Sequence, residues 1–252
     1  MSLMVALRKE LMEQARSHRL LVVAVFLAFW GLASPLLAKL TPELLKLVPE
    51  GDLLAQLIPP PTIADAVGQY VKNLSQFGVI LALLLGMGAV VQEKERGTAA
   101  LMLSKPLSRG AFLAAKATAL GLVFTASTAL AGVGAYYYTM LLFGAPSLGG
   151  WLALNGLLAL FFGVYVAVAL LCSVVGRSQV MTGGLAFGGL VVLGGLGSLP
   201  GIGDYLPSRL LSWGASLALH QSGAAWPALA VSGAIIVVSL LAAWAILERQ
   251  EL

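Results

Sequence analysis

The chain has 252 residues, a mean hydropathy of +0.93 and only 10% charged residues. An ordinary soluble domain carries about 25% charged residues, so this composition excludes a soluble globular protein. Continuous apolar runs are typical of membrane-spanning helices rather than of the alternating strands of a barrel. The sequence therefore predicts an all-α integral membrane protein. In such a protein the net charge of +4 reflects topology, and we expect no nucleic-acid partner.

Residues 1–19 are predicted to form an amphipathic helix that lies on the membrane surface. Its apolar stripe consists of Leu3, Leu7 and Leu11. Its opposite face carries three charged side chains, Lys9, Glu13 and Arg16. This separation of apolar and charged faces is typical of an interfacial helix.

Residues 20–247 are predicted to form a bundle of six membrane spans, because six apolar stretches approach the length of roughly 20 residues that crosses a bilayer. The stretches are Leu20–Leu37, Leu74–Val91, Ala111–Tyr138, Trp151–Val175, Val180–Leu199 and Trp226–Leu247. The first could be mistaken for a signal peptide cut after Ala33. Its apolar run is too long for that, and Glu10 and Glu13 precede it, so we expect a retained anchor.

The distribution of basic residues predicts the orientation of these spans. Only four basic residues fall in segments that would lie outside if the N-terminus is inside: Lys39, Lys46, Lys72 and Arg209. The remaining eleven of the 15 lie in inner segments, as the positive-inside rule requires. Both termini are therefore predicted to be cytoplasmic, in the inner membrane of a prokaryote.

Two outer segments are longer than a turn. In residues 39–72, Thr41-Pro42-Glu43 and the stretch from Thr62 to Asp65 are predicted helix starts, the second as a variant of the capping box. Residues 206–221 could form a short apolar helix that dips back toward the membrane between the fifth and sixth spans. The Gly-rich stretch 194–204 is interpreted as a helix end and turn.

The most charged stretch of the chain joins the second and third spans. Gly97 is expected to end the preceding helix, Thr98 to cap a short new one, and Ser108 to cap the third span. Residues 92–106 would then present Leu101 and Met102 on a brief surface helix suited to docking. The alternative is a solvated loop whose charges only enforce topology.

This stretch resembles the signature of ABC-2 type transporter permeases, in which Glu-Arg-Gly-Thr precedes a Leu-rich turn, Pro, Ser-Arg and a Lys in the next span. The matching residues are Glu95, Arg96, Gly97, Thr98, Leu101, Leu103, Pro106, Ser108, Arg109 and Lys116. Residues Arg8–Leu21 resemble the entry helix of that family. Within the family, the chain is most similar to the group named for multi-copper enzyme maturation permeases.

The resemblance implies that residues 92–106 are a coupling helix, which inserts into a groove of a separate ATP-binding subunit. The residues that would contact this subunit are Glu93, Glu95, Arg96, Gly97, Thr98, Leu101 and Met102, with Lys9, Glu13 and Arg16 as a second contact and residues 176–179 as a minor third. ATP and Mg²⁺ would be bound by that partner. The chain itself lacks the G-x-x-x-x-G-K-[ST] motif that cradles nucleotide phosphates.

The spans contain no evident site that could supply the energy for transport. Ion-driven transporters usually carry ionisable residues inside the membrane, whereas the only charged candidate, Lys116, lies near the inner end and is expected to snorkel to water. Ion sites built from backbone groups remain an alternative. We therefore expect an ATP-driven exporter or, alternatively, a permease-like transmitter of conformation that moves no substrate.

Glycines in the fifth span suggest a helix contact. Gly184 and Gly188 form a small-x-x-x-small pair, followed by Gly189. The pair serves either packing within the chain or, as the resemblance implies for the second and fifth spans, the centre of a dimer. The second permease copy would be identical or a sister chain.

Few polar residues lie within the spans, among them Thr125, Ser127, Thr128 and Asn155, which favours a lipophilic or amphipathic substrate. Ser216 and His220 have the i, i+4 spacing of a pair on one helix, which leaves an intramembrane serine protease as a remote alternative. No catalytic orienting group accompanies them. Two histidines and one cysteine, Cys172, are too scattered for a metal site, and Cys172 is interpreted as a packing residue.

Overall fold

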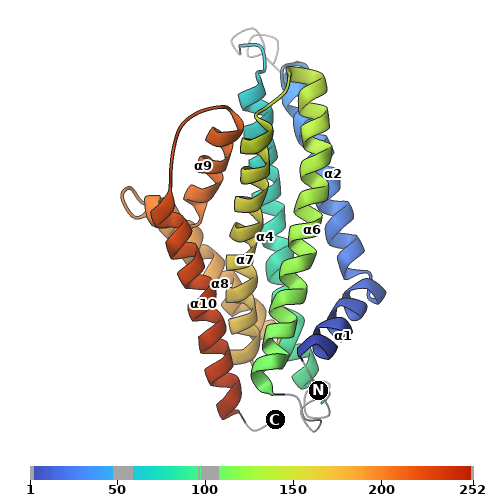
Figure 1. Ribbon diagram of the computed structural model, residues 1–252, viewed down its shortest axis with the longest axis vertical. Helices are drawn as coiled ribbons and strands as arrows, with labels where there is room; N and C mark the ends of the chain where they lie inside the picture. Colours follow the sequence, from blue (N-terminus) through green and yellow to red (C-terminus); the bar gives the residue numbers. More distant parts are fainter. Residues whose placement is uncertain (1–2, 48–58, 96, 98–107, 251–252) are drawn as a thin grey trace.

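The computed structural model describes residues 3–47, 59–95, 97 and 108–250, and within these ranges the chain is helical with no strand (Figure 1). The helices are α1 (Leu3–Arg16), α2 (Arg19–Leu45), α4 (Ile63–Glu95), α6 (Arg109–Phe143), α7 (Leu148–Val175), α8 (Gln179–Gly197), the 3-10 helix η1 (Gly203–Tyr205), α9 (Ser208–Ala218) and α10 (Trp226–Arg249). Among the described residues, six helices are long and apolar enough to cross a membrane. The predicted six-span, all-α architecture is confirmed.

Helix α7 lies at the centre of the bundle, with α8 and α10 at its edge. In the 18-residue apolar stretch of each helix that could span the membrane, 61% of the residues are buried in α7, against 11% in α8 and 17% in α10. Helix α7 contacts α4, α6, α8, α9 and α10. The two ends of the chain lie at the same end of the bundle, at the bottom of Figure 1. An even number of spans requires this arrangement, and it brings α1 and the ends of α4, α6 and α10 together.

Side chains cap several helix starts. The hydroxyls of Ser108, Ser147 and Ser178 each accept the backbone N–H three residues further on, at the starts of α6, α7 and α8. These bonds satisfy N–H groups that have no partner within the helix. At the start of α4, the Asp65 carboxylate accepts from the N–H and the hydroxyl of Thr62, both at 2.7 Å. The predicted caps at Ser108 and Thr62 are confirmed.

The predicted helix start at Thr41-Pro42-Glu43 is wrong, because α2 continues through it to Leu45 with Pro35 and Pro42 inside the helix. Proline removes one backbone hydrogen bond and usually breaks or kinks a helix. Here the Thr41 hydroxyl donates to the Leu37 carbonyl at 2.8 Å, which gives that turn another bond. A local proline signal was therefore overridden by the helix that precedes it.

Helix α9 covers part of the predicted short helix at residues 206–221 and packs along α7 (Figure 1). Its buried face consists of Leu210, Gly214 and Ala218. The Gly-rich stretch before it ends α8 and turns, with Gly201 at a φ of 82°, as predicted. Whether α9 dips into the bilayer stays a prediction.

Candidate functional site

The last turn of α4 is tied to the surrounding helices by four consecutive residues, 92–95, which we call the α4 junction. Consecutive helical residues point about 100° apart, so four in a row face all round the helix. Water or neighbouring helices must satisfy these polar side chains, and here each of the four has a partner on another element. The junction lies directly before the segment that was predicted to dock on a partner.

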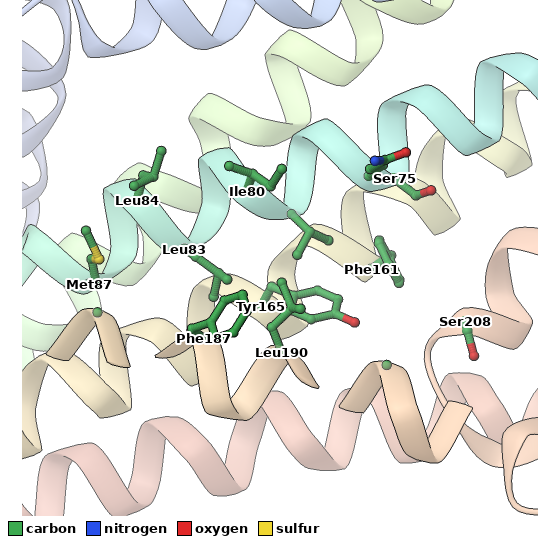
Figure 2. Close-up of a pocket in the computed structure, with 14 residues that line it drawn as sticks. Ser75, Ile80, Leu83, Leu84, Met87, Phe161, Tyr165, Phe187, Leu190 and Ser208 are labelled. Carbon is green, nitrogen blue, oxygen red and sulfur yellow. The ribbon is translucent and has the colours of Figure 1, made fainter. Parts of the chain in front are cut away.

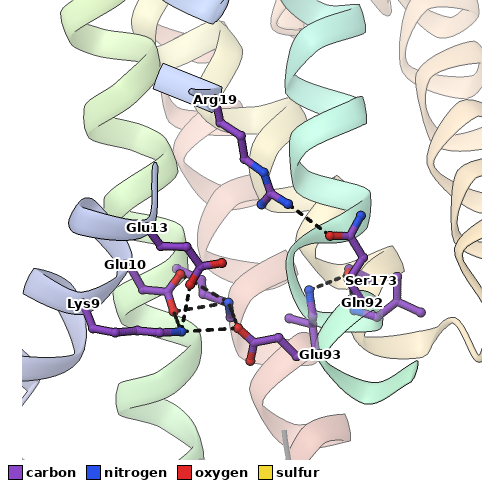
Figure 3. Close-up of polar contacts among 10 residues, drawn as sticks. Lys9, Glu10, Glu13, Arg19, Gln92, Glu93 and Ser173 are labelled. Carbon is purple, nitrogen blue, oxygen red and sulfur yellow. Dashed lines mark hydrogen bonds and ion pairs between the residues drawn. The ribbon is translucent and has the colours of Figure 1, made fainter. Parts of the chain in front are cut away.

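Two of these residues, Gln92 and Glu95, contact the first residues of two other spans. The Gln92 side chain accepts from the Arg19 guanidinium of α2 at 3.1 Å (Figure 3). The Glu95 carboxylate accepts from the N–H of Gln179, the first residue of α8, at 2.9 Å. Both contacts join the end of α4 to the beginning of another span.

Lys94 joins the α4 junction to α7 and to the end of α10. Its ammonium donates to the Val174 carbonyl at 2.5 Å and to the Gln250 side-chain oxygen at 2.6 Å. The Gln250 side-chain nitrogen donates to the same Val174 carbonyl at 3.1 Å. These bonds occupy a carbonyl in the last turn of α7, where acceptors lack intrahelical partners.

Glu93 belongs to an ion-pair cluster of five residues from α1, α4 and α6 (Figure 3): Lys9, Glu10, Glu13, Glu93 and Lys116. The Lys116 ammonium lies 2.7 Å from a Glu93 oxygen and 3.2 Å from a Glu10 oxygen. The Lys9 ammonium lies 3.0 Å from both Glu10 and Glu13 and 3.5 Å from Glu93. The cluster thus fastens α1 to two spans.

The expectation that Lys116 snorkels to water is wrong. Its side chain is only 4% exposed, and that of Glu10 is 6% exposed. A buried ammonium requires carboxylate partners because desolvation otherwise costs several kcal/mol, and α1 supplies one of them. Helix α1 accordingly turns Glu10 and Gln14 inward, while Met4, Val5 and Met12 are exposed.

The charges of the cluster shift the pKa values of its outer members. Partial burial by itself would lower the pKa of Lys9, but the hydrogen bond to Glu13 and the charges of Glu10 and Glu93 outweigh it and raise that pKa. Burial would raise the pKa of Glu13, but Lys9, through its hydrogen bond and its charge, lowers it. Both groups are therefore held in their charged forms at neutral pH.

Ser173 of α7 forms hydrogen bonds with the backbone of α4, one turn before the junction. Its hydroxyl donates to the Met87 carbonyl at 2.7 Å and accepts from the N–H groups of Val90 and Val91 at 2.9 and 3.0 Å. Met87 and Val91 are an i, i+4 pair, which bond directly in a regular helix. A side chain that competes for both groups of such a pair is a recognised cause of helix bending, although α4 runs as one helix through this point.

Arg109 anchors the other side of the predicted docking segment. Its guanidinium donates to the carbonyls of Leu247, Glu248 and Gln250 at 2.5, 2.9 and 2.7 Å. A cation is favoured at a helix C-terminus because the last carbonyls lack partners and the helix dipole is negative there. The start of α6 is thereby fixed to the end of α10.

The structure describes part of the predicted contact set. Glu93 and Glu95 lie in the α4 junction, Lys9 and Glu13 lie in the ion-pair cluster, and Arg16 ends α1. Gly97 has a φ of 67° just after α4 ends at Glu95, so the predicted helix break is confirmed. The other predicted residues, Arg96, Thr98, Leu101 and Met102, lie outside the described residues.

The glycines of α8 lie in different surroundings. A Cβ added at Gly184 or Gly188 meets no other atom of the described residues within 4 Å, whereas one at Gly189 meets the Val168 side chain at 3.1 Å. Gly189 therefore packs against α7. Packing within the described part of the chain does not account for the Gly184–Gly188 pair.

The premise of a Ser216–His220 pair is wrong. Helix α9 ends at Ala218, and His220 has a φ of 60°, so the two residues do not share a helical face. The Ser216 hydroxyl instead donates to the Trp213 carbonyl at 2.7 Å. A nucleophile needs a base within hydrogen-bond reach, and this geometry does not provide the predicted one.

Among the described residues, the carboxylates of Glu10, Glu13 and Glu93 are close enough to hold a metal ion, within 4.8 Å of one another. The ammonium groups of Lys9 and Lys116 already lie between these carboxylates. The charges of the three acids are thus largely balanced by lysines. The arrangement is that of a structural ion-pair cluster.

Residues 4–252 match the family model described as "ABC-2 family transporter protein". The chain belongs to the ABC-2 family. This ABC-2 protein is also similar to "Uncharacterized transmembrane protein YxlG" of Bacillus subtilis (strain 168), with 27% identity over 97% of the chain and 95% of the relative. Family membership makes it a multi-pass membrane component of an ABC system, which pairs with an ABC ATPase subunit and is not itself catalytic. The multi-copper maturation subgroup stays a prediction.

Sequence reasoning missed Glu10, Ser173 and Gln250, and it placed Gln92 and Lys94 in the coupling segment without assigning them a contact. The one available signal was the helical phase of residues 92–95, where four polar side chains in a row cannot all face water on a buried helix. Nothing local marks Ser173 or Gln250. Their partners lie roughly 80 residues or more away in sequence.

Proposed function

We propose that this ABC-2 protein is the permease subunit of an ATP-driven exporter, and that residues 92–106 couple it to the ATPase. The partner subunit would bind ATP and Mg²⁺ and push on this segment as it closes. The observation that carries the proposal is the α4 junction, which joins the base of the segment to α1, α2, α6, α7, α8 and the end of α10.

The contacts of the α4 junction suit the transmission of force. A displacement of residues 96–107 acts on Glu95 and on Ser108, whose neighbour Arg109 is bonded to the end of α10. Ion pairs and hydrogen bonds with defined partners transmit motion because a packed bundle switches between arrangements rather than deforming continuously. Movement of the lower turn of α4 relative to its upper part would be easiest beside Ser173, which competes for the backbone groups of Met87 and Val91.

Both chain termini and the coupling segment would face the cytoplasm of a prokaryotic cell. The basic residues Arg19, Lys94, Arg109 and Lys116 belong to the junction, the ion-pair cluster or the anchor at α10, at the end of the bundle that holds the termini. Lys39 and Lys72 belong to the opposite ends of α2 and α4. This distribution supports the positive-inside orientation.

The first test is whether an ATPase accompanies the chain. Purified from its native membrane in mild detergent, the chain is expected to retain an ATP-hydrolysing partner. A Leu101→Pro variant should still insert but should lose roughly tenfold in transport per ATP hydrolysed, a typical coupling free energy. Leu53→Pro, in the predicted outer segment, is the matched control.

The absence of any co-purifying ATPase would overturn the proposal, as would equal transport by Leu101→Pro and the wild type. A third result separates the alternative function: if the complex hydrolyses ATP in response to a signal and moves no substrate in sealed vesicles, the protein transmits conformation and is no exporter.

A functional permease would be a dimer, homodimeric unless a sister chain replaces one copy, with Gly184 and Gly188 of α8 near the shared axis. Small residues let helices approach closely in lipid, and these two face away from the rest of the described chain. In a Cys172→Ala background, single cysteines at these two positions are expected to form disulfides between copies. This requires a Cα–Cα distance of roughly 4.4–6.8 Å.

Gly189→Cys is the matched control, because Gly189 faces Val168 within the chain and should not cross-link copies. Cross-linking at Gly189 that equals cross-linking at Gly184 and Gly188 would contradict the assignment. So would a complete lack of cross-linking at Gly184 and Gly188 in the native membrane.

A further inference from the structure

An apolar cavity of about 730 Å³ lies between α4, α7 and α8 (Figure 2). Its volume falls within the range of roughly 300–1,000 Å³ that is usual for small-molecule sites. Leu83, Met87, Phe187 and Leu190 line one part of it. This part offers van der Waals contact and no polar group that could orient a ligand.

The cavity becomes polar toward its other end. In Figure 2, Ser75 and Ser208 lie at the end away from Met87, and the Tyr165 hydroxyl points in the same direction. Ser208 also lines a second hollow of about 370 Å³, together with Asp204, Arg209 and other residues of the α8–α9 connection. The apolar cavity and the polar hollow thus meet at Ser208.

The cavity is accessible from the apolar flank of the bundle. Three of its lining side chains, Ile80, Leu84 and Phe187, are 45%, 53% and 63% exposed. In a membrane protein such surfaces face hydrocarbon. An occupant would therefore enter from the bilayer, which favours a lipid over a water-soluble molecule.

The face of α8 that lines the cavity differs from the face proposed for dimerisation. Gly183, Phe187, Leu190 and Gly194 recur at i, i+4, i+7 and i+11, so they share one face. Gly184 and Gly188 lie one residue further on, about 100° around the helix. A second copy docked on the latter pair leaves the cavity to another occupant.

Charge decides which kind of lipid fits the polar hollow. Arg209 is half-exposed and lies 3.6 Å from Asp204, so this ion pair is loose and solvent-accessible. A phosphate oxygen can replace that partner with a charge-assisted hydrogen bond to the guanidinium. The neighbouring Ser208 hydroxyl can donate to the same group, whereas the Ser212 hydroxyl already donates to the Arg209 carbonyl at 3.0 Å.

We propose that this site binds a single-chain membrane amphiphile with an anionic headgroup, of the lysophospholipid class. Its acyl tail lies along the cavity toward Met87, and its phosphate lies at Ser208 and Arg209. This inference deepens the proposed function, because such an amphiphile is then the class of substrate exported. Binding itself requires neither ATP nor the partner subunit.

The test measures binding of oleoyl-lysophosphatidylglycerol to the purified chain in phosphatidylcholine nanodiscs, with oleoylglycerol as a probe that has the same tail and no phosphate. Gly194→Leu fills the cavity, since a Cβ at Gly194 meets no other described atom within 4 Å. It should weaken binding of both probes about tenfold, the effect of displacing roughly two buried methylene groups. Gly195→Leu is the matched control, because that Cβ is equally free and does not line the cavity.

A second variant tests the headgroup. Arg209→Gln should weaken binding of lysophosphatidylglycerol to the level of oleoylglycerol and leave oleoylglycerol binding unchanged. In the wild-type chain, a photoactivatable group at the end of the tail should label the α4 segment around Met87. This last measurement needs no variant and so does not depend on variant folding.

Equal effects of Gly194→Leu and Gly195→Leu would overturn the tail site, as would label spread evenly over the exposed faces of α2 and α10. Loss of both probes, or of neither, in Arg209→Gln would overturn the headgroup site. Binding that behaves as expected in a chain with no ATPase partner would support the lipid site and refute the exporter.

Discussion

Replacing Lys116 with Met is expected to lower the free energy of unfolding by about 3–5 kcal/mol, the usual cost of removing one partner of a buried ion pair. Lys116 is 4% exposed and lies between Glu10 and Glu93. Methionine matches its length but leaves both carboxylates without this ammonium. Unfolding of the purified chain in mixed micelles measures the loss.

Two companion variants show whether charge burial is the cause. Lys72→Met changes an exposed lysine on the same bundle and should alter stability by less than about 0.5 kcal/mol. The double variant Lys116→Met/Glu10→Met should recover part of the loss, because Glu93 keeps Lys9 at 3.5 Å. If the double variant is no more stable than Lys116→Met, burial of an unpaired carboxylate is not the cause of the loss.

Replacing Gly150 with Val is expected to displace α9 from α7. A Cβ at Gly150 would overlap the Leu217 carbonyl of α9, and backbone cannot move aside as a flexible side chain can. Overpacking of this kind typically costs about 1–3 kcal/mol. Faster proteolysis of residues 219–225, which link α9 to α10, together with lower thermal stability, would report the displacement.

Gly149→Val is the matched control for this prediction. Gly149 is the neighbouring residue in the first turn of α7, and a Cβ there meets no described atom within 4 Å. Both variants share the change in helix propensity, so the difference between them isolates the contact with α9. Similar proteolysis of the two variants would show that α9 does not depend on Gly150 for its position.

The number and nature of the spans were predictable because each depends on a local property. A run of apolar residues forms a helix in lipid wherever it occurs, since backbone groups must be satisfied within the segment. The caps at Ser108 and Thr62 are equally local, each involving partners three residues apart. The predicted helix start at Pro42 failed because proline is only a statistical signal for a helix boundary. The preceding helix and the bond of the Thr41 hydroxyl to the Leu37 carbonyl outweighed that signal.

The candidate site was predictable only in part. The resemblance directed attention to Glu93, Glu95 and Gly97, and the structure places the first two in a junction of several helices. The resemblance gave no indication that the polar face of α1 turns inward to meet Lys116. Helical periodicity defines two faces of an amphipathic helix, but it does not say which face meets protein when a buried charge requires a partner.

Composition and hydropathy by themselves determined that this protein spans a membrane six times and has both ends on one side. These properties depend on the free energy of transferring each segment into lipid, which is a sum over neighbouring residues. Tertiary structure alone decided which residues 83 to 156 positions apart meet, as in the bonds of Ser173 to α4 and of Lys94 to Gln250. Such contacts depend on how the helices pack, and no local pattern encodes the depth or rotation of one helix against another.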